Sequence, residues 1–398
     1  MEKKQNVFVE LHILQNFAPA NLNRDDTGAP KDCVFGGVRR ARISSQCLKR
    51  AIRTTFREQE LLPDGNIGER TRLLAAELVR QLEAKGKPHD EAERVVEAAI
   101  NATGLDLDKE KKTQYLVFLG RSEIARIAEL CVKYWEELVK ASEKAETAEK
   151  QKKKEKKEKG PGVSEDIKKA LGAVLDGGRA ADVALFGRML ADLPGKNIDA
   201  ASQVAHAIST NKVDVEFDFY SAVDDLQPEE SSGAGMMGTV EYNSACFYRY
   251  SNIDVVQLLK NLGDDKQLAL RTVEAFLRSS VLAVPTGKQN SMAAQNPPSA
   301  VFAVVRRSGL WSLTNAFVRP VSADKTGDLV QNSIKALDSC WRQLVDVYGG
   351  GGILGKWYVG LGAGEITNLK SDDGTKDVDS LVKNVVKCVS EALEKGHE

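Results

Sequence analysis

The chain has 398 residues and a formal net charge of -1, and 42% of its residues are hydrophobic. This length allows a substantial buried core, and the composition is ordinary for a soluble globular protein. The sequence holds no apolar run long enough to cross a bilayer, and residues 1–4 lead directly into a strand pattern. We therefore expect a cytoplasmic protein with no signal peptide and no membrane partner.

The 6 cysteines and 4 histidines are scattered along the chain, with no C-x-x-C pair and no Cys/His zinc spacing. Such cysteines in an unsecreted chain are expected to be reduced thiols. The sequence also lacks the Walker A, dinucleotide-binding, G-x-S-x-G and H-E-x-x-H motifs. We therefore expect no cofactor, no bound metal and no catalytic residue.

In chain order, alternating apolar residues predict a first strand over 7–15, and His12 on it is expected to be a packed or surface histidine. Ser44 and Ser45 are good N-cap residues, and the residues after them predict a helix over 45–57. The predicted apolar face of this helix carries Cys47, Leu48, Ala51, Ile52, Thr55 and Phe56. The opposite face carries Gln46, Lys49, Arg50, Arg53 and Arg57.

The stretch around this helix is strongly basic. Between Lys31 and Arg57 there are eight lysines and arginines and one acid, Asp32, in a chain close to neutrality. The predicted helix start offers free backbone N–H groups and the positive end of the helix dipole. Gly36-Gly37 would let the backbone approach a partner closely, because no Cβ is in the way. The pattern favours a phosphate-tracking surface over a solvated basic helix.

Helices are predicted next over 70–82, 90–102, 122–140 and 164–193, the last with a break at Gly177-Gly178. The lysine-rich stretch 149–162 has no residue suited to a core, so we expect a solvated helix extension or a disordered loop.

Two alternating segments, 213–220 and 239–250, predict paired strands joined by a long tip over 221–238. The tip ends with Met236 and Met237 between glycines. Two interpretations stay open. The methionines could form a flexible apolar wedge that inserts between bases or contacts a neighbouring subunit, or the tip could fold back on its own core.

The rest of the chain alternates again between helices and strands, with a polar loop over 284–290. The strand, helix, strand, strand, helix, strand order up to residue 306 predicts a ferredoxin-like, RRM-type α+β fold with a very large insertion after the first helix. No RNP1 pattern is present, so base stacking in the common RRM manner is not expected. Helices are predicted over 253–262, 266–281, 325–348 and 378–393, and strands over 300–306, 310–318 and 357–359.

Asp25 and Asp26 are the best catalytic candidates, as adjacent carboxylates in a loop beside the basic helix. A metal-dependent phosphodiesterase could use such acids to hold Mg²⁺. Neighbouring carboxylates are common in loops, and capping a turn or pairing with Arg24 or Arg39 is the more ordinary structural role. A metal-dependent RNase is therefore the alternative function.

Several of these stretches resemble the CasC family, which supplies the repeating backbone subunit of the type I-E CRISPR Cascade surveillance complex. The likeness is carried by residues 22–26, Lys31-Asp32, Phe35-Gly36-Gly37, 39–53 and the hairpin over 217–250. Residues 113–130 and 285–290 are also similar, whereas 149–162 looks like an added insertion.

The resemblance implies an RRM-like palm formed by 1–58 and 241–398, helical fingers over 59–203, and a thumb hairpin over 204–240. It implies a non-catalytic subunit that polymerises along a CRISPR guide RNA and displays guide bases for pairing with target DNA. The implied partners are guide RNA, target DNA, further copies of this chain, and the large, small, end-capping and guide-processing Cascade subunits. Related type III backbone subunits cleave RNA with an acidic loop residue, which keeps Asp25 and Asp26 of interest. A protein scaffold that binds no nucleic acid is a further alternative.

The predicted RNA contacts come from the basic stretch, the hairpin tip and the loop over 284–290. By resemblance, the RNA backbone is contacted by Arg24, Lys31, Ser44, Gln46, Lys49, Arg50 and Arg53, with Met236 and Met237 at the thumb tip. The predicted surface also includes Arg39, Arg40, Arg42, Lys288, Gln289 and Asn290.

Overall fold

The computed structural model describes residues 5–151, 163–222, 236–325, 327–361, 366–371 and 373–395. The chain divides into two compact units. Unit 1 contains residues 1–61, 202–256 and 270–398, and unit 2 contains 62–201 and 257–269. Residues 152–162 of the lysine-rich stretch and residues 223–235 of the hairpin tip lie outside the described part of the chain, so the predictions made for them are not tested. Within the described part, no helix is long and apolar enough to span a membrane.

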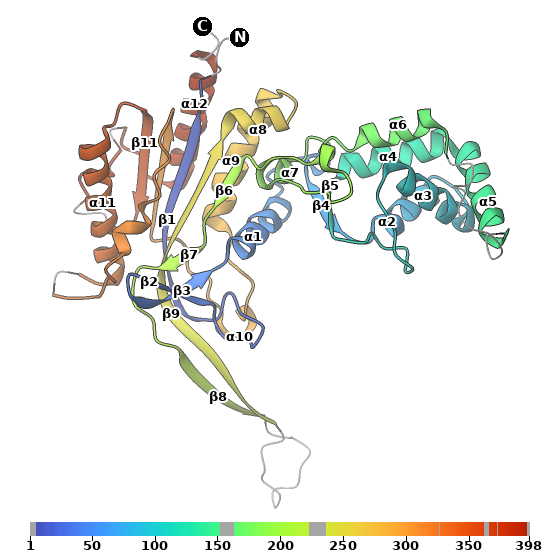
Figure 1. Cartoon of the computed structure of the whole chain (residues 1–398). Helices are drawn as coiled ribbons and strands as arrows, with labels where there is room; N and C mark the ends of the chain where they lie inside the picture. The colour runs from blue at the N-terminus through green and yellow to red at the C-terminus, as the bar shows by residue number, and fades with distance from the viewer. Residues whose placement is uncertain are drawn as a thin grey trace, which may run out of the picture. The chain divides into compact units, whose positions relative to one another are not determined.

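Unit 1 is built on an antiparallel sheet in a mixed α+β fold (Figure 1). The strand order is β11-β10-β1-β9-β7-β3-β2, and β6 and β8 also pair with β9. The first strand therefore lies between β10 and β9, with which it pairs over most of its length. The strands are β1 (Phe8–Ala20), β2 (Asp32–Phe35), β3 (Val38–Ile43), β6 (Ser202–Val204), β7 (Ala207–Ser209), β8 (Glu216–Ala222), β9 (Met236–Asp254), β10 (Ala300–Arg306) and β11 (Ile353–Gly360).

Helices cover both faces of this sheet. Helix α11 packs against the face that carries Leu14, Tyr248 and Phe302. Helix α9 covers the other face, where the buried Arg249 of β9 donates to the Ser280 carbonyl at 2.7 Å. The helices that lie wholly in unit 1 are α1 (Ser45–Glu58), α10 (Gln289–Met292), α11 (Leu329–Tyr348) and α12 (Val378–Lys395). Two further helices, α8 (Val255–Asn261) and α9 (Lys266–Leu282), are shared between the two units.

The α11 face of the sheet contains a buried polar network. His12 is fully buried, its Nδ1 lies 2.8 Å from the Tyr248 hydroxyl, and burial lowers its pKa to about 3. Glu10 on the same strand pairs with Arg306 at 2.9 Å and accepts a hydrogen bond from the Tyr250 hydroxyl. The prediction that His12 is a packed residue is confirmed.

Most predicted elements of unit 1 are confirmed, and two are wrong. Residues 310–318 contain a 3-10 helix over Leu313–Phe317 instead of a strand. Leu313 and Phe317 are its buried residues and stand four apart, a spacing that puts two residues on one face of a helical turn and also on one face of a strand, so the apolar pattern did not separate the two. The loop predicted over 284–290 ends two residues early, because the short helix α10 begins at Gln289. The second predicted strand begins three residues late, at Glu216.

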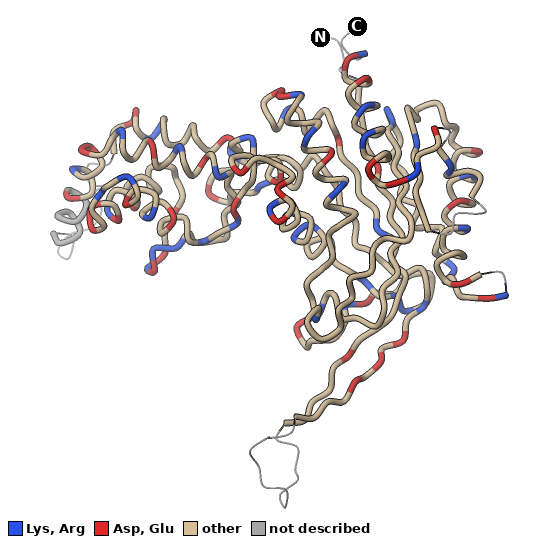
Figure 2. The backbone as a smooth tube through the Cα atoms, turned by 180° about the vertical axis from the view of Figure 1, so that it is seen from behind, with Lys and Arg blue, Asp and Glu red and all other residues tan. Residues whose placement is uncertain are grey.

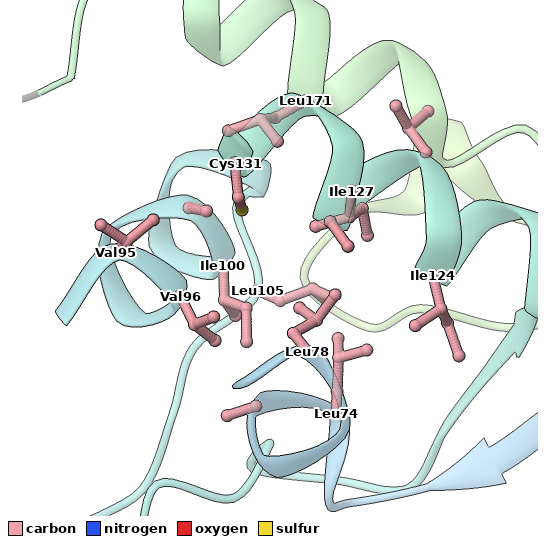
Figure 3. Close-up of a cluster of buried hydrophobic side chains, with 14 of the residues drawn as sticks. Leu74, Leu78, Val95, Val96, Ile100, Leu105, Ile124, Ile127, Cys131 and Leu171 are labelled. Carbon is pink, nitrogen blue, oxygen red and sulfur yellow. The ribbon is translucent and has the colours of Figure 1, made fainter. Parts of the chain in front are cut away.

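Unit 2 has a helical core, shown in Figure 3. Leu74 and Leu78 of α2, Ile100 of α3, and Ile127 of α4 are fully buried in one apolar cluster. The predicted helix over 122–140 is two helices, because α4 ends at Lys133 and α5 begins at Trp135. The elements are β4 (Gly68–Thr71), α2 (Leu74–Glu83), α3 (His89–Thr103), β5 (Val117–Gly120), α4 (Arg121–Lys133), α5 (Trp135–Gln151), α6 (Glu165–Val174) and α7 (Ala181–Phe186).

Gly177-Gly178 interrupts the helical pattern of unit 2 as predicted, beside a buried ion pair. Glu123 and Arg188 have no exposed side-chain surface, and the Arg188 guanidinium lies 2.9 Å from the Glu123 carboxylate. The same carboxylate accepts the backbone N–H groups of Gly120 and Gly177. The Glu123 carboxylate therefore holds the loop between α6 and α7 in place through the Gly177 N–H. Moving the loop away would leave a buried charge with fewer partners, which is energetically costly.

Candidate nucleic-acid interface

The start of helix α1 is capped as the sequence predicts. The Ser44 hydroxyl accepts the Cys47 N–H at 3.3 Å, so this side chain is committed to the cap. Leu48, Ile52, Thr55 and Phe56 are buried, which confirms the predicted apolar face. The basic residues lie opposite: Arg50, Arg57 and Gln46 are exposed, while Lys49 and Arg53 are half-buried.

The loop over 21–31 connects three parts of unit 1. Asn23 accepts the Ser44 N–H at 2.8 Å through its side chain, which joins the loop to the helix cap. The Asn21 amide donates to the Glu241 carbonyl at 2.9 Å, which joins it to strand β9 at the base of the hairpin. Gly287 packs directly on this loop, since a Cβ there would lie 2.4 Å from the Leu22 carbonyl oxygen. Helix α1, the hairpin and the loop that carries Lys288 therefore hold fixed positions around residues 21–31.

Lys31, Arg42 and Arg50, which we call the basic cluster, come together at the start of α1. The Arg42 N–H donates to the Lys31 carbonyl at 2.9 Å, so the two residues lie side by side. Lys31 and Arg50 both lie near Cys47: burial raises the pKa of this thiol, and the charges of Arg50 and Lys31 act in the opposite direction. Within the described residues, none of the three cations makes an ion pair with a carboxylate. The cluster is thus an unneutralised cationic surface.

Arg39 and Arg40 follow one another on β3 but have opposite environments. Arg39 is exposed and pairs with Asp32 at 2.9 Å. Arg40 is fully buried, and its guanidinium donates to the carbonyls of Phe35, Ser209, Thr210, Phe317 and Val318. The side chain of Arg40 cannot reach RNA from this position, so we remove it from the predicted RNA surface. Its role is to fasten the β2–β3 hairpin to two distant loops.

Gly36 and Gly37 form the turn between β2 and β3, and both have positive φ, at 63° and 79°. The close approach predicted here occurs within the chain itself: a Cβ on Gly36 would lie 1.8 Å from the Val318 carbonyl oxygen. A Cβ on Gly37 would meet nothing within 4 Å. Gly36 is therefore required for packing as well as for its backbone conformation.

This difference gives a matched pair of variants. Gly37→Ala should cost about 1 kcal/mol of unfolding free energy, the usual cost of a left-handed non-glycine residue. Gly36→Ala should cost roughly 2 kcal/mol more, because the turn must also move away from Val318. Urea unfolding of the two full-length variants measures the difference. Equal losses would show that the turn is not held against Val318.

The loop that carries Lys288 borders a groove of about 600 Å³. Lys288 is half-buried with a left-handed backbone (φ 53°), and Asn290 is exposed. The Gln289 amide donates to the Pro285 and Ala294 carbonyls, so it stabilises the loop. The groove is lined by Ala18, Pro19, Asp218, Tyr220, Val240, Tyr242, Lys288, Ser291 and Met292.

The β8–β9 hairpin continues from the sheet and is exposed over its full β8 strand (Figure 1). One face, with Tyr220 and Tyr242, lines the groove; the other carries the exposed rings of Phe217 and Phe219. Figure 2 shows acidic positions along the paired strands, and these strands carry no lysine or arginine before Arg249. The described strands of this hairpin therefore offer no cation to a phosphate before Arg249.

Met236 and Met237 begin β9 and are 60% and 65% exposed. They pair with Ala222 and Ser221 of β8, so at least these two residues extend away from the core. The next residue, Gly238, lies under the ring of Tyr220. A larger residue would not fit there, because a Cβ would lie 2.5 Å from the Tyr220 hydroxyl oxygen.

Asp25 shapes its own loop. Its Oδ1 accepts the hydroxyl and N–H of Thr27 and the N–H of Ala29, and these bonds, that of the hydroxyl foremost, hold the pKa of Asp25 below its ordinary value. Asp26 and Arg24 are exposed on the same loop. In the described part of the chain, no group of three or more His, Cys, Asp or Glu side chains is placed to hold a metal ion. The geometry of Asp25 is that of a turn cap.

His206 is a member of this surface that sequence reasoning missed. It lies between β6 and β7, is exposed, and its Nδ1 is 3.1 Å from a guanidinium nitrogen of Arg42. No local signal in the sequence could have found it, because 164 residues separate it from Arg42.

The chain is similar to proteins of known structure over nearly its whole length. A chain of a solved structure described as "CRISPR RNA-guided surveillance complex, pre-nicking" shares 30% identity, with a TM-score of 0.82, over 96% of this chain and 99% of that chain. A chain of a "CRISPR RNA-guided surveillance complex" shares 24% identity, with a TM-score of 0.69, over 95% and 99%, a likeness of fold alone. No curated protein matches the chain. The model of the CT1975-like protein family matches residues 9–384, and the chain therefore belongs to the CT1975-like protein family.

Proposed function

We propose that this protein is a non-catalytic backbone subunit of a CRISPR RNA-guided surveillance complex, and that it binds guide RNA through its phosphate backbone. The observation that carries the proposal is the basic cluster at the start of α1, where three cations lack carboxylate partners among the described residues. Such a surface attracts a polyanion and reads no base sequence. Similarity over nearly the whole length to a chain of a CRISPR surveillance complex supports the same function.

The parts of the proposed interface have different tasks. The basic cluster, with Lys49 and Arg53 further along α1, holds phosphates. The hairpin with Met236 and Met237 supplies apolar groups that displace or cover a base, since its strands carry no cation before Arg249 with which to hold phosphate. We assign the ferredoxin-like palm to residues 1–58 and 241–398, the helical fingers to 59–203 and the thumb to 204–240. The proposal also includes the type I-E subtype.

Subunit polymerisation follows from the same division of tasks. One copy covers a short RNA segment, so a continuous guide requires several copies in a row, together with other subunits of the complex. The bases between contacts stay available for pairing with target DNA, which leaves sequence recognition to base pairing.

Co-expression with a CRISPR array and its neighbouring genes tests the proposal. We expect the tagged protein to purify as a large ribonucleoprotein that contains guide RNA of defined length. Recovery of an RNA-free monomer that remains monomeric after addition of guide RNA would contradict it and would favour a protein scaffold.

The alternative, a metal-dependent RNase, requires Asp25 or Asp26 to act on RNA. Labelled guide RNA and target RNA incubated with the purified protein and Mg²⁺ should remain intact. Site-specific cuts that disappear in Asp26→Ala would show that the alternative is correct. Asp25→Ala is a poor probe, because it also removes the turn cap.

A further inference from the structure

His206 lies at the edge of the basic cluster, where positive charges surround its ring. Its ring faces Arg42 across a 3.1 Å contact between Nδ1 and the guanidinium. Arginine can only donate hydrogen bonds, so Nδ1 accepts and the proton of the neutral ring sits on Nε2. The other guanidinium bond of Arg42, from Nε to the Asp32 carbonyl at 3.1 Å, keeps this side chain in place.

The groups around His206 all disfavour its protonation. Partial desolvation by the neighbouring chain lowers the pKa of His206, although the side chain is exposed, and the charges of Arg42 and Lys31 act in the same direction. The carboxylate of Asp32, whose backbone carbonyl accepts from Arg42, is paired with Arg39. In the free protein at neutral pH, His206 is therefore an uncharged acceptor for Arg42.

We propose that Arg42 and His206 bind one phosphate of the RNA backbone together, and that the negative charge of this phosphate makes His206 take up a proton from solvent. The inference rests on the proposed RNA-binding function. A phosphate between the two side chains accepts from the Arg42 guanidinium and from the ring of His206. Once protonated, both ring nitrogens donate, so His206 gives up its bond from Arg42 and Arg42 turns its N–H to the same phosphate. The ring takes up one proton from solvent, and no covalent bond changes.

The proton linkage makes RNA affinity depend on pH. RNA binding takes up a proton only between the lower pKa of His206 in the free protein and its higher pKa in the complex. In that window the affinity falls as pH rises, by up to about tenfold per pH unit at full linkage. The two cysteines nearest the cluster do not interfere, because burial raises the pKa of both Cys33 and Cys47 above the ordinary thiol value.

The test uses the full-length protein and a fluorescein-labelled single-stranded RNA, with dissociation constants measured by polarisation at pH 6, 7 and 8 and constant ionic strength. We expect the wild-type dissociation constant to rise at least about threefold from pH 6 to pH 8. His206→Gln keeps a neutral hydrogen-bonding side chain and should remove this dependence. His206→Arg carries a permanent charge and should bind at pH 8 at least as tightly as the wild type does at pH 6.

His89 of unit 2 is the control, since it is a histidine outside the basic cluster and a hydrogen bond with Glu83 raises its pKa. His89→Gln should keep the wild-type pH dependence. A wild-type affinity that is the same at all three pH values, or a His206→Gln variant with the wild-type dependence, would overturn the inference while leaving the RNA-binding function intact. Failure of every protein to bind RNA at any pH would instead overturn the proposed function.

Discussion

Replacing Lys31 and Arg50 with glutamine is expected to weaken the binding of single-stranded RNA about 25-fold at 0.1 M salt. Each phosphate contact contributes a slope of about -0.7 to the logarithm of affinity against the logarithm of salt, which amounts to about fivefold at this concentration. Two lost contacts should therefore also flatten the slope by about 1.4. The loss should be the same for RNAs of unrelated sequence, because phosphate contacts carry no base information.

The matched control removes the same charge elsewhere on unit 1. Arg342 of α11 and Lys387 of α12 are 61% and 77% exposed and lie outside the basic cluster. Their double replacement with glutamine should leave the salt slope unchanged. Polarisation titrations from 50 to 400 mM salt (concentrations on the order of those used for such slopes) separate the two cases. An equal loss in both double variants would mean that net charge, and not the cluster, attracts RNA.

Helix α1 shows what local sequence signals could predict. Its cap at Ser44, its apolar face and its basic face all follow from the residue order within one short stretch, and the structure has each of them. The β8–β9 pairing was predictable for the same reason, since both segments alternate. Local pattern failed over Leu313–Phe317, where a few apolar residues fit either a strand or a helical turn until the partners of Leu313 and Phe317 are known.

The composition of the interface depends on distant contacts and could not be predicted in this way. Arg40 and Arg42 have the same residue type and neighbouring positions, yet one is buried under carbonyls from residues 209–210 and 317–318 and the other lies beside His206. Charge counting assigns both to RNA. Only the tertiary fold separates a cation that stabilises the protein from one that is available to a ligand.

Arg40→Met is therefore expected to lower the unfolding free energy by about 3–5 kcal/mol, because several buried carbonyls lose their donor together at about 1–3 kcal/mol each. The substitution leaves the carbonyls of Ser209, Thr210 and Phe317 buried without their donor. Hydrogen bonds from a charged donor contribute more to stability than ordinary neutral ones, so their loss is costly.

Arg39→Met is the control on the next residue. Its side chain is 58% exposed and its pair with Asp32 is a surface ion pair, so the expected loss is about 0–1 kcal/mol. Urea unfolding of both variants, followed by RNA binding of the folded fraction, distinguishes the roles. Arg40→Lys should not rescue stability, because one ammonium group cannot reach carbonyls on both sides as the planar guanidinium does. If Arg40→Met unfolded like Arg39→Met and lost RNA affinity instead, Arg40 would belong to the RNA surface after all, and the β2–β3 hairpin would have to be held by other contacts.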